Sequence, residues 1–434
     1  MLSNFKWLRY LNYAIKTFED ISKLSGQEFR SWQRQKQWSI ARYHYKNNPF
    51  YRKKIGNNFP EKWEDLPIME KSDYQVDLEK LLSKGYTRKN IYIANTSGSS
   101  GHPFFFAKNQ EAHAMSWALI KDRYSWHGLK LNSKQARFYG IPLKTTSKVQ
   151  EHIKDWMINR VRFQIFDLSD EILEKYLLRF TKIKFEYIYG YTNSLVLFAR
   201  YLIDNKIILI DICPSLKLCI PTSETVTKED REILVKGFGL NVVNEYGVSE
   251  VGGIVAFEDN NSNWVLSAET QYVEILDQDN NLLENNKGGK VVITDLHNKT
   301  MPFIRYNVGD IGVSSEYTIK GKYPVLQKLL GRTNDNIRLP SGRVSPGLTF
   351  YYISRSILES SGVLKEFIIR QSALDTFEFD VVCDRDFYEN EVKEIENQMD
   401  IYLEPGLKLK IHRVPKISRP SSGKIKHFYS EINS

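Results

Sequence analysis

A run of small polar residues, NTSGSSGHPF at 95–104, interrupts a chain that is otherwise rich in aromatic side chains. Glycine allows positive φ and close approach of the backbone, so such a loop can turn its N–H groups inward around phosphate oxygens. It is not a Walker A loop, because GxxxxGK[ST] occurs nowhere in the chain. Taken alone, this composition is more typical of a plain connecting loop.

Four further stretches carry residue types suited to phosphate and metal chemistry. They are VNEYGVSEVGG (243–253), RYNVGDIG (305–312), GRTNDNIRLPSGRVSP (331–346) and RPSSGKIKHF (419–428). The Glu250 carboxylate is the hard oxygen ligand that Mg²⁺ prefers. Asp310 offers two acceptors to two adjacent hydroxyls, and Lys424, beside a glycine, is a compact charge on a long stem. Taken alone, Glu250 also fits a solvated surface charge, Asp310 fits a turn aspartate, and Lys424 fits an exposed lysine near the end of the chain.

Taken in order, the five motifs resemble those of the adenylate-forming superfamily, which includes acyl-CoA synthetases and adenylation domains. Within it the chain is similar to the phenylacetate–CoA ligase branch, particularly to members associated with capsular polysaccharide biosynthesis. NPFYRKKI (48–55), LPIMEKSDY (66–74) and GYTNSL (190–195) resemble other stretches of that branch. Each motif is weak and the ordered set is strong, and the likeness covers nearly the whole chain.

The resemblance implies an ATP-dependent ligase that activates a small carboxylic acid as an acyl-adenylate and releases pyrophosphate. ATP and Mg²⁺ are the expected ligands. The acyl group then passes to a thiol, amine or hydroxyl, and coenzyme A, a carrier and a sugar all remain open as acceptors. The capsule-associated branch favours polysaccharide biosynthesis. An acyl-CoA ligase for an aromatic or other small acid is the alternative, and an inactive nucleotide-binding relative is disfavoured because Glu250, Asp310 and Lys424 are all present.

Site roles follow from the resemblance, residue by residue. The loop would grip the β- and γ-phosphates through Thr96, Ser97, Gly98, Ser99, Ser100 and Gly101. Tyr246 would stack on adenine, Asn244 would hydrogen-bond its exocyclic amine, and Glu250 would bind Mg²⁺. Asp310 would accept hydrogen bonds from the ribose, with Arg332 as a second contact to ribose and phosphate. Lys424 would complete adenylation. The Thr222-Ser223-Glu224 stretch sits where relatives carry a small residue and a glutamate that line the nucleotide, which adds Ser223 and Glu224 to the site. The YGVSE motif adds Gly247 and Ser249.

The sequence departs from the family pattern in three places. The hinge position, commonly aspartate or lysine, is Asn334. The cysteine and histidine cluster that many relatives carry after the YGxSE motif is missing, so no zinc is expected. The acyl pocket is not recognisable; YIYGYTNS (187–194) is a candidate wall, although these tyrosines fit a core equally well.

Composition places the chain among soluble globular proteins of at least two domains, with 434 residues of which 41% are hydrophobic. Three cysteines without metal or disulfide spacing suit a reducing cytoplasm. A net charge of +9 raises nucleic acid as a partner, but acids and bases are interleaved and no nucleic-acid motif occurs. There is no signal peptide and no apolar run of about 18 residues.

The elements expected around these motifs change along the chain. Residues 1 to about 90 are expected to be mostly helical. An apolar stripe recurs at helical spacing near the N-terminus, and we expect this helix to dock on its own domain, with peripheral membrane contact as the alternative. Its members are Leu2, Phe5, Leu8, Leu11, Ile15 and Phe18.

The middle of the chain predicts strands at 207–212, 216–221 and 240–247, with a helix at 228–239 that makes a βαβ crossover. Segments 270–283 and 288–296 alternate like antiparallel strands.

The C-terminal part predicts a helix after Pro346, a hairpin at 366–384, a helix whose apolar face runs from Tyr388 to Leu403, and a strand at 407–414. The expected fold is therefore α/β plus α+β. A large domain (1–331) has mixed sheets and flanking helices, and a small mobile domain (332–434) carries Lys424.

Overall fold

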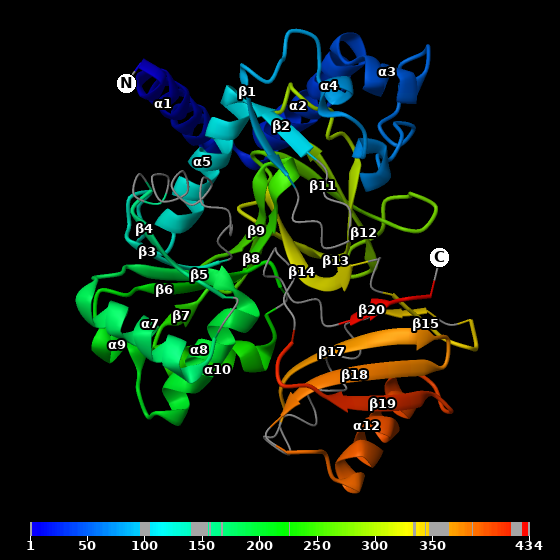
Figure 1. Cartoon of the computed structure of the whole chain (residues 1–434). Helices are drawn as coiled ribbons and strands as arrows, with labels where there is room; N and C mark the ends of the chain where they lie inside the picture. The colour runs from blue at the N-terminus through cyan, green and yellow to red at the C-terminus, as the bar shows by residue number, and fades with distance from the viewer. Residues whose placement is uncertain are drawn as a thin grey trace. The chain divides into compact units, whose positions relative to one another are not determined.

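The computed structural model describes residues 2–95, 105–139, 155, 158–165, 168–224, 226–332, 336–342, 344–346, 364–383, 385–417 and 428–432. The chain divides into two compact units. The first comprises Met1–Val308 and Gly312–Lys328, and the second comprises Gly309–Ile311 and Leu329–Ser434. Figure 1 shows the succession of elements from the blue N-terminus to the red C-terminus.

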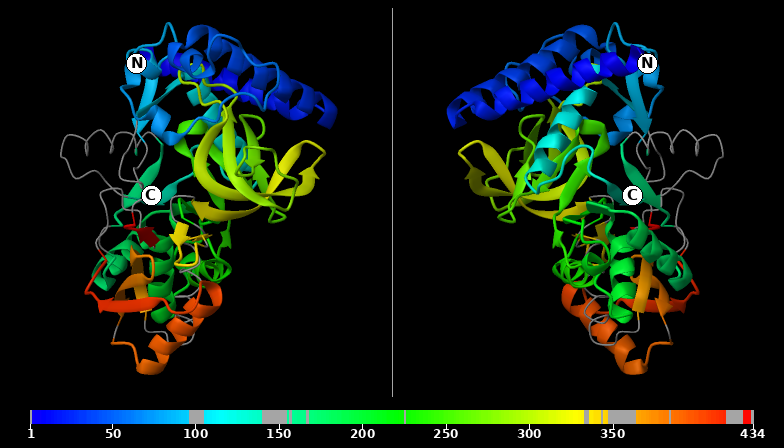
Figure 2. Two further views of the ribbon diagram at one scale, coloured as in Figure 1. Left: turned by 90° about the vertical axis from the view of Figure 1, so that its right-hand side faces the viewer. Right: turned by 90° about the vertical axis from the view of Figure 1, so that its left-hand side faces the viewer.

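The first unit begins with helices, as the sequence predicts. A capping box formed by Ser25 and Glu28 starts the second helix, and Asn48 with Pro49 starts the third. Figure 2 shows the two long helices crossing one end of the unit, beside the hairpin of β13 (Tyr306–Ile319) and β14 (Tyr323–Arg332). Arg30 Nη1 donates a 2.6 Å hydrogen bond to the carbonyl of Gly321 in the turn of this hairpin. The elements are α1 (Leu2–Lys23), α2 (Gly26–Asn47), α3 (Pro49–Ile55), η1 (Lys71–Tyr74) and α4 (Leu78–Leu81).

Helix α1 docks on its own unit, as expected. Ala14, Phe18 and Ile21 are buried in a cluster shared with helix α5 (Gln110–Ser125). Phe18 of the predicted stripe is buried in this cluster and Ile15 packs against it, whereas Leu8 is 51% exposed, so the stripe marks the buried face in part. No helix within the described ranges is long and apolar enough to cross a bilayer.

A 12-stranded mixed sheet forms the body of the first unit, in the order β11-β12-β13-β14-β10-β9-β8-β6-β5-β3-β4, with β7 also paired to β6. A separate antiparallel hairpin, β1 (Ile91–Asn95) with β2 (Phe105–Asn109), pairs Asn95 with Phe105. The sheet strands are β3 (Gln135–Phe138), β4 (Arg160–Phe163), β5 (Tyr187–Tyr191), β6 (Leu218–Thr222), β7 (Asn241–Val242), β8 (Glu245–Val248), β9 (Gly253–Glu258), β10 (Trp264–Leu266), β11 (Gln271–Leu276), β12 (Gly288–Asp295), β13 (Tyr306–Ile319) and β14 (Tyr323–Arg332).

One half of the sheet is parallel, and helices cover its outer face. Figure 1 shows α7 (Asp170–Lys182), α8 (Thr192–Asp204) and α10 (Lys228–Phe238) against β3, β5 and β6. Phe138, Phe163 and Phe198 stack in the core between them. The opposite face packs on α5 and α1. The β6–α10–β7 crossover is parallel, which confirms the predicted βαβ unit.

Two predictions in this region are wrong. Residues 207–212 are not a strand, because Leu209–Ile212 forms the short helix α9. Ile208 and Ile212 are 45% and 36% exposed, so the apolar run is not buried on two sides, and a short run of this kind fits either structure. Residues 240–247 form two strands, β7 and β8, rather than one. The antiparallel pair of segments 270–283 and 288–296 is confirmed as β11 and β12.

The second unit contains a four-stranded sheet in the order β19-β18-β17-β20, with helix α12. The predicted hairpin and final strand are confirmed as β17–β18 and β19, whereas β20 was not predicted. Ile395 and Met399 of α12 are buried, but Tyr388 is 59% exposed and lies before the helix. The helix expected after Pro346 lies outside the described residues. The remaining bounds are β15 (Asn336–Arg338), β16 (Val344–Pro346), β17 (Leu364–Ala373), β18 (Thr376–Cys383), α12 (Glu389–Tyr402), β19 (Lys408–Arg413) and β20 (Phe428–Ser430). Together the two units confirm the predicted α/β plus α+β fold class.

Candidate active site

Several predicted site residues lie where the parallel strands end. Carboxyl ends of parallel strands meet at one edge of a sheet, which is where open α/β sheets bind ligands. Ser223 and Glu224 follow β6 directly, and Ser223 has a φ of 71°. Glu224 Oε2 accepts a 2.8 Å hydrogen bond from the Asn193 N–H, so this carboxylate caps the start of α8.

Tyr246 lies in β8, and Asn244 lies just before it. The Tyr246 ring is buried with its centroid 6.2 Å from that of Trp264, while Asn244 is partly exposed. The Asn244 N–H donates to Glu258 Oε2 at 3.0 Å, and its carbonyl accepts from the Glu258 N–H at 3.1 Å. These two hydrogen bonds to Glu258 of β9 therefore fix the backbone of Asn244, one of the two residues predicted to contact adenine. Gly247 and Ser249 are exposed.

The turn that carries Glu250 is shaped by two glycines. The 3₁₀ turn η2 (Ser249–Val251) is followed by Gly252 and Gly253, with φ of 103° and 102°. Such backbone strongly favours glycine. A Cβ at Gly252 would also lie 2.8 Å from Gln271 Nε2. Glu250 is partly buried, and its Oε1 accepts a 3.1 Å hydrogen bond from the Tyr306 hydroxyl.

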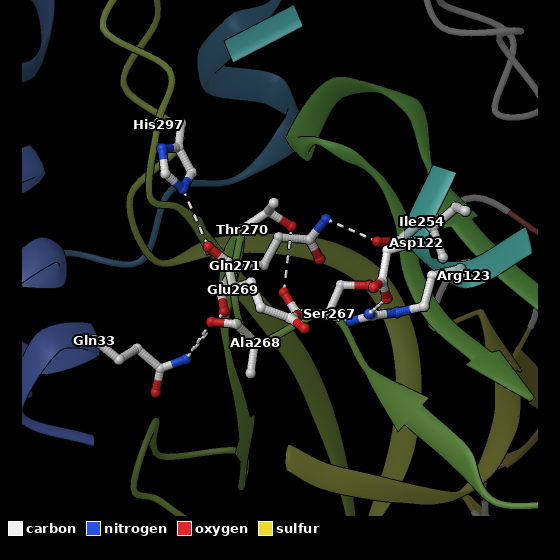
Figure 3. Close-up of polar contacts among 10 residues, drawn as sticks. All are labelled: Gln33, Asp122, Arg123, Ile254, Ser267, Ala268, Glu269, Thr270, Gln271 and His297. Atoms are coloured by element: carbon white, nitrogen blue, oxygen red, sulfur yellow. Dashed lines mark hydrogen bonds and ion pairs between the residues drawn. The ribbon is translucent and has the colours of Figure 1, made fainter. Parts of the chain in front are cut away.

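Behind this turn lies a buried polar frame formed by residues 267–271 and their partners (Figure 3). Gln271 donates from its amide to the Ile254 carbonyl at 3.1 Å. Arg123 Nη2 lies 2.6 Å from Glu269 Oε2, and both side chains are only 1% exposed. A buried pair of this kind is costly to break, so the frame holds the strand onto which the glycine turn packs.

Lys108 is a site residue that the sequence did not indicate. It lies in β2 and is buried, and its Nζ donates to the Ser249 carbonyl at 2.7 Å. Burial lowers the pKa of Lys108 from its usual value, and the Asp295 and Glu250 carboxylates partly offset this effect. In the sequence, the position of this lysine directly after the apolar run FFFA was the only indication that it is unusual. In the fold it anchors the turn that presents Glu250.

Glu245, directly before the YGVSE stretch, is a second residue that sequence reasoning missed. Its buried carboxylate accepts hydrogen bonds from the hydroxyls of Tyr189 (2.9 Å), Thr222 (3.2 Å) and Tyr124 (3.4 Å). Burial raises its pKa, and these hydrogen bonds oppose the shift. The side chain ties β8 to β5, β6 and α5.

The remaining predicted residues are less fully described. Asp310 is buried in β13. Arg332 is the last residue of β14, and its side chain lies outside the description. Among the described residues no group of three or more His, Cys, Asp or Glu side chains could hold a metal ion. The predicted site and hinge residues that lie outside the described ranges are Thr96, Ser97, Gly98, Ser99, Ser100, Gly101, Asn334 and Lys424.

Comparison with known proteins identifies the fold. No known family profile matches the chain. It is 26% identical to Protein CapK of Staphylococcus aureus over 338 residues, which are 74% of this chain and 72% of that protein. A 2-hydroxyisobutyryl-CoA ligase in the postadenylation state matches 94% of this chain and 91% of its own, with a TM-score of 0.74 and 17% identity. The chain has the fold of the adenylate-forming ligases.

Further solved proteins share this adenylate-forming fold at lower similarity. The O-succinylbenzoate coenzyme A synthetase of Bacillus subtilis, solved with AMP, has a TM-score of 0.52 and 14% identity over 77% of this chain and 67% of its own. The amide bond synthetase McbA of Marinactinospora thermotolerans has a TM-score of 0.54 and 14% identity over 78% and 69%. The resemblance inferred from the ordered motifs is thus confirmed, and the fold adds nothing about the acid or the acceptor.

Replacing Lys108 by methionine is expected to lower adenylation about tenfold, because a charged hydrogen bond is worth about 1.5–3 kcal/mol. Without the bond to the Ser249 carbonyl, Glu250 is held less precisely and more Mg²⁺ should be needed for half-maximal rate. Lys322→Met is the matched control. Burial lowers the pKa of Lys322 as well, but its ammonium donates to the Ser22 and Leu24 carbonyls. Equal Mg²⁺ dependence in both variants would argue against a positioning role for Lys108.

The same variant has a predicted pH signature. Because the pKa of Lys108 is lower in the folded than in the unfolded chain, the unfolded chain binds more protons between these two values. The contribution of Lys108 to the free energy of unfolding therefore rises with pH between these two pKa values. The free energy of unfolding of the wild type minus that of Lys108→Met should increase as the pH is raised towards 10.5. Urea unfolding across the alkaline range measures this difference.

Proposed function

We propose that the chain is an AMP-forming ligase that activates a small carboxylic acid with ATP and passes the acyl group to an acceptor. The observation that carries the proposal is the YGVSE turn. On an adenylate-forming fold, it presents a carboxylate held by Tyr306 and Lys108 directly after the strand that carries Tyr246. Tyr246 and Gly247 lie in β8, Ser249 and Glu250 lie in the turn after it, and Ser223 and Glu224 directly follow β6.

The proposed first step joins two anions. An oxygen of the acid attacks the α-phosphorus of ATP and forms an acyl–phosphate anhydride. The bond from the α-phosphorus to the oxygen bridging to the β-phosphate breaks, and pyrophosphate leaves with the electron pair. Fixed positive charge and hydrogen-bond donors must face the developing charge. We assign this task to Lys424, to the donors of Thr96, Ser97, Gly98, Ser99, Ser100 and Gly101, and to Arg332.

The residues present fit one Mg²⁺ ion. Tyr306 occupies one oxygen of the Glu250 carboxylate, so the other oxygen can face a cation. Mg²⁺ is commonly bound by one or two carboxylates together with substrate phosphates and water. When bound, the ion would neutralise charge on the transferring phosphate. Glu250 would orient it, and Lys108 would keep Glu250 in place.

Recognition of the nucleotide is assigned to the motif residues. Tyr246 and Asn244 would contact adenine, with Ser223, Glu224, Gly247 and Ser249 lining the site. Asp310 would bind the ribose hydroxyls. We propose functional domains of 1–331 and 332–434, with the smaller one moving about Asn334 between half-reactions.

The acceptor separates two versions of the function. The likeness to capsule-associated members supports a sugar or carrier acceptor in polysaccharide biosynthesis, in the cytoplasm. Coenzyme A is the alternative, because structural neighbours include a 2-hydroxyisobutyryl-CoA ligase solved with CoA and an O-succinylbenzoate coenzyme A synthetase. Release of AMP with each candidate acceptor, starting from a supplied acyl-adenylate, distinguishes these versions.

Acid-dependent exchange of pyrophosphate into ATP tests the shared first step without knowledge of the acceptor. We expect at least one acid in a broad panel to support exchange. ATP binding without exchange for any acid would contradict the ligase activity and favour a nucleotide-binding relative.

Asp310→Ala is expected to raise the KM for ATP at least about tenfold, because two hydrogen bonds from the ribose to a carboxylate are lost. The melting temperature should change little if Asp310 acts mainly on the nucleotide. Exchange rates at varied ATP measure the effect. An unchanged ATP dependence in the folded variant would refute the assignment of Asp310.

A further inference from the structure

Arg137 presents a planar cation beside two aromatic rings. It is the third residue of β3, and its Cζ lies 4.3 Å from the ring centroid of Tyr139 and 4.6 Å from that of Tyr189. Cation–π contacts hold a guanidinium in place while leaving its N–H edge able to donate. Arg137 is only partly buried. Among the described residues no carboxylate forms an ion pair with Arg137, although its charge acts on the buried Glu245 carboxylate, whose pKa it lowers.

The neighbouring strand adds further positive charge. In the parallel register Arg137 lies opposite Arg162 of β4, and Gln135 lies opposite Arg160. Arg160 and Arg162 both contact Asp155. The pKa of Arg160 is lowered by burial and by the charges of Arg137 and Arg162. Arginines on adjacent strands repel one another, so an anion placed at Arg137 would stabilise this face of the sheet.

The acidic group that faces Arg137 across an aromatic ring is Glu245. The Tyr189 ring contacts Arg137, while its hydroxyl donates to Glu245 Oε1 at 2.9 Å. Glu245 already accepts hydrogen bonds from three hydroxyls, and burial raises its pKa. The Glu245 carboxylate is therefore already hydrogen-bonded to hydroxyls and does not form an ion pair with the Arg137 guanidinium.

The position of Arg137 relative to the YGVSE turn suits one end of a short acyl chain. In the sheet order β8 is followed by β6, β5 and β3. Strands lie about 4.8 Å apart, so the backbones of β3 and β8 are separated by about 14 Å. Both strands run in the parallel half, with their carboxyl ends at the same edge. Side chains from the two strands could hold the two ends of one small molecule across this distance.

We propose that Arg137 binds a second carboxylate of the substrate, so that the acid activated by this enzyme is a dicarboxylic acid. The inference rests on the proposed function and deepens it. One carboxylate would be adenylated as described above, and the other would stay ionised in a bidentate pair with the guanidinium. Tyr139 and Tyr189 would orient the fork.

The test compares diacids with acids that lack the second carboxylate. Pyrophosphate exchange is measured with succinate, glutarate and adipate, and with butyrate, valerate and monomethyl glutarate. We expect the diacids to be preferred by the wild type. R137Q should lower kcat/KM for the preferred diacid about 30-fold while sparing the monoacids, because a charged hydrogen-bonded pair is lost. The KM for ATP and the melting temperature should stay unchanged.

Arg179→Gln is the matched control. Arg179 also lies over an aromatic ring, 5.5 Å from the centroid of Phe163, but it belongs to α7 on the other face of the sheet. It should leave the acid preference unchanged. If R137Q folds poorly, R137M keeps much of the aliphatic stem against the rings and should show the same loss. R137K keeps the charge and should retain part of the diacid preference.

Direct binding separates this inference from the proposed activity. Glutarate binding, measured by calorimetry with a non-hydrolysable ATP analogue present, should also weaken about 30-fold in R137Q. If no acid supports exchange but glutarate binding depends on Arg137, the ligase activity fails and the subsite stands. Equal glutarate binding by wild type and R137Q overturns the subsite. Equal losses for diacids and monoacids also overturn it, because they indicate a structural role.

Discussion

Lys424→Ala is expected to slow adenylate formation about 10³-fold, the upper range for loss of one group that stabilises a developing charge. The alanine variant lacks the ammonium that we propose bridges the acid and the α-phosphate. Transfer from a chemically supplied acyl-adenylate should be spared, because that step comes after the bridge has been used. Pyrophosphate exchange measures the first half-reaction, and AMP release from the supplied adenylate measures the second.

Lys426→Ala is the control for Lys424, because it removes the same charge two residues along the chain. It should leave both half-reactions near the wild-type rate. If Lys424→Ala slows both equally, Lys424 holds the C-terminal part together and does not act on phosphate. If it slows neither, the likeness to adenylate-forming enzymes does not extend to this end of the chain.

Glu250→Gln is expected to reduce exchange about 10²-fold, since it removes the charge on the proposed Mg²⁺ ligand. Glutamine can still accept the Tyr306 hydrogen bond through its carbonyl oxygen, so the turn should keep its shape. Raised Mg²⁺ should restore part of the rate. Glu316→Gln, at an exposed position of β13, is the matched control. A loss that Mg²⁺ does not reduce, accompanied by a lower melting temperature, would assign Glu250 a structural role.

Local pattern was sufficient for much of the fold. The alternation in β17–β18 and the turn between them gave the hairpin, and the apolar spacing of Ile395 and Met399 gave α12. It failed at 207–212, where six apolar or acidic residues fit a strand and a helix equally well. The buried face of α1 was predicted in part, because contact with α5 covers Ala14 and Ile21 together with Phe18 of the predicted stripe.

Motifs indicated candidate residues such as Glu250 and Tyr246, and their proposed roles stay predictions. Lys108, Glu245 and Arg137 were missed for a common reason. Each is an ordinary charged residue in the sequence, and only pairing of distant strands gives it a distinctive neighbourhood. Glu224 shows the reverse case. Its motif suggested nucleotide binding, while the structure shows its carboxylate on the Asn193 N–H at the start of α8.

The β1–β2 hairpin fixes both ends of the segment that joins its strands, so this segment can be exchanged without moving the strands. Asn95 and Phe105 are held opposite each other, so whatever joins them begins and ends at one place. The entropy of closing a loop grows slowly, by about 0.6 kcal/mol for each doubling of length. Insertions, deletions or grafts between these two residues would therefore leave the register of both strands intact. Evolution, or an engineer, can therefore change the sequence between these two residues without redesigning the strands on either side of it.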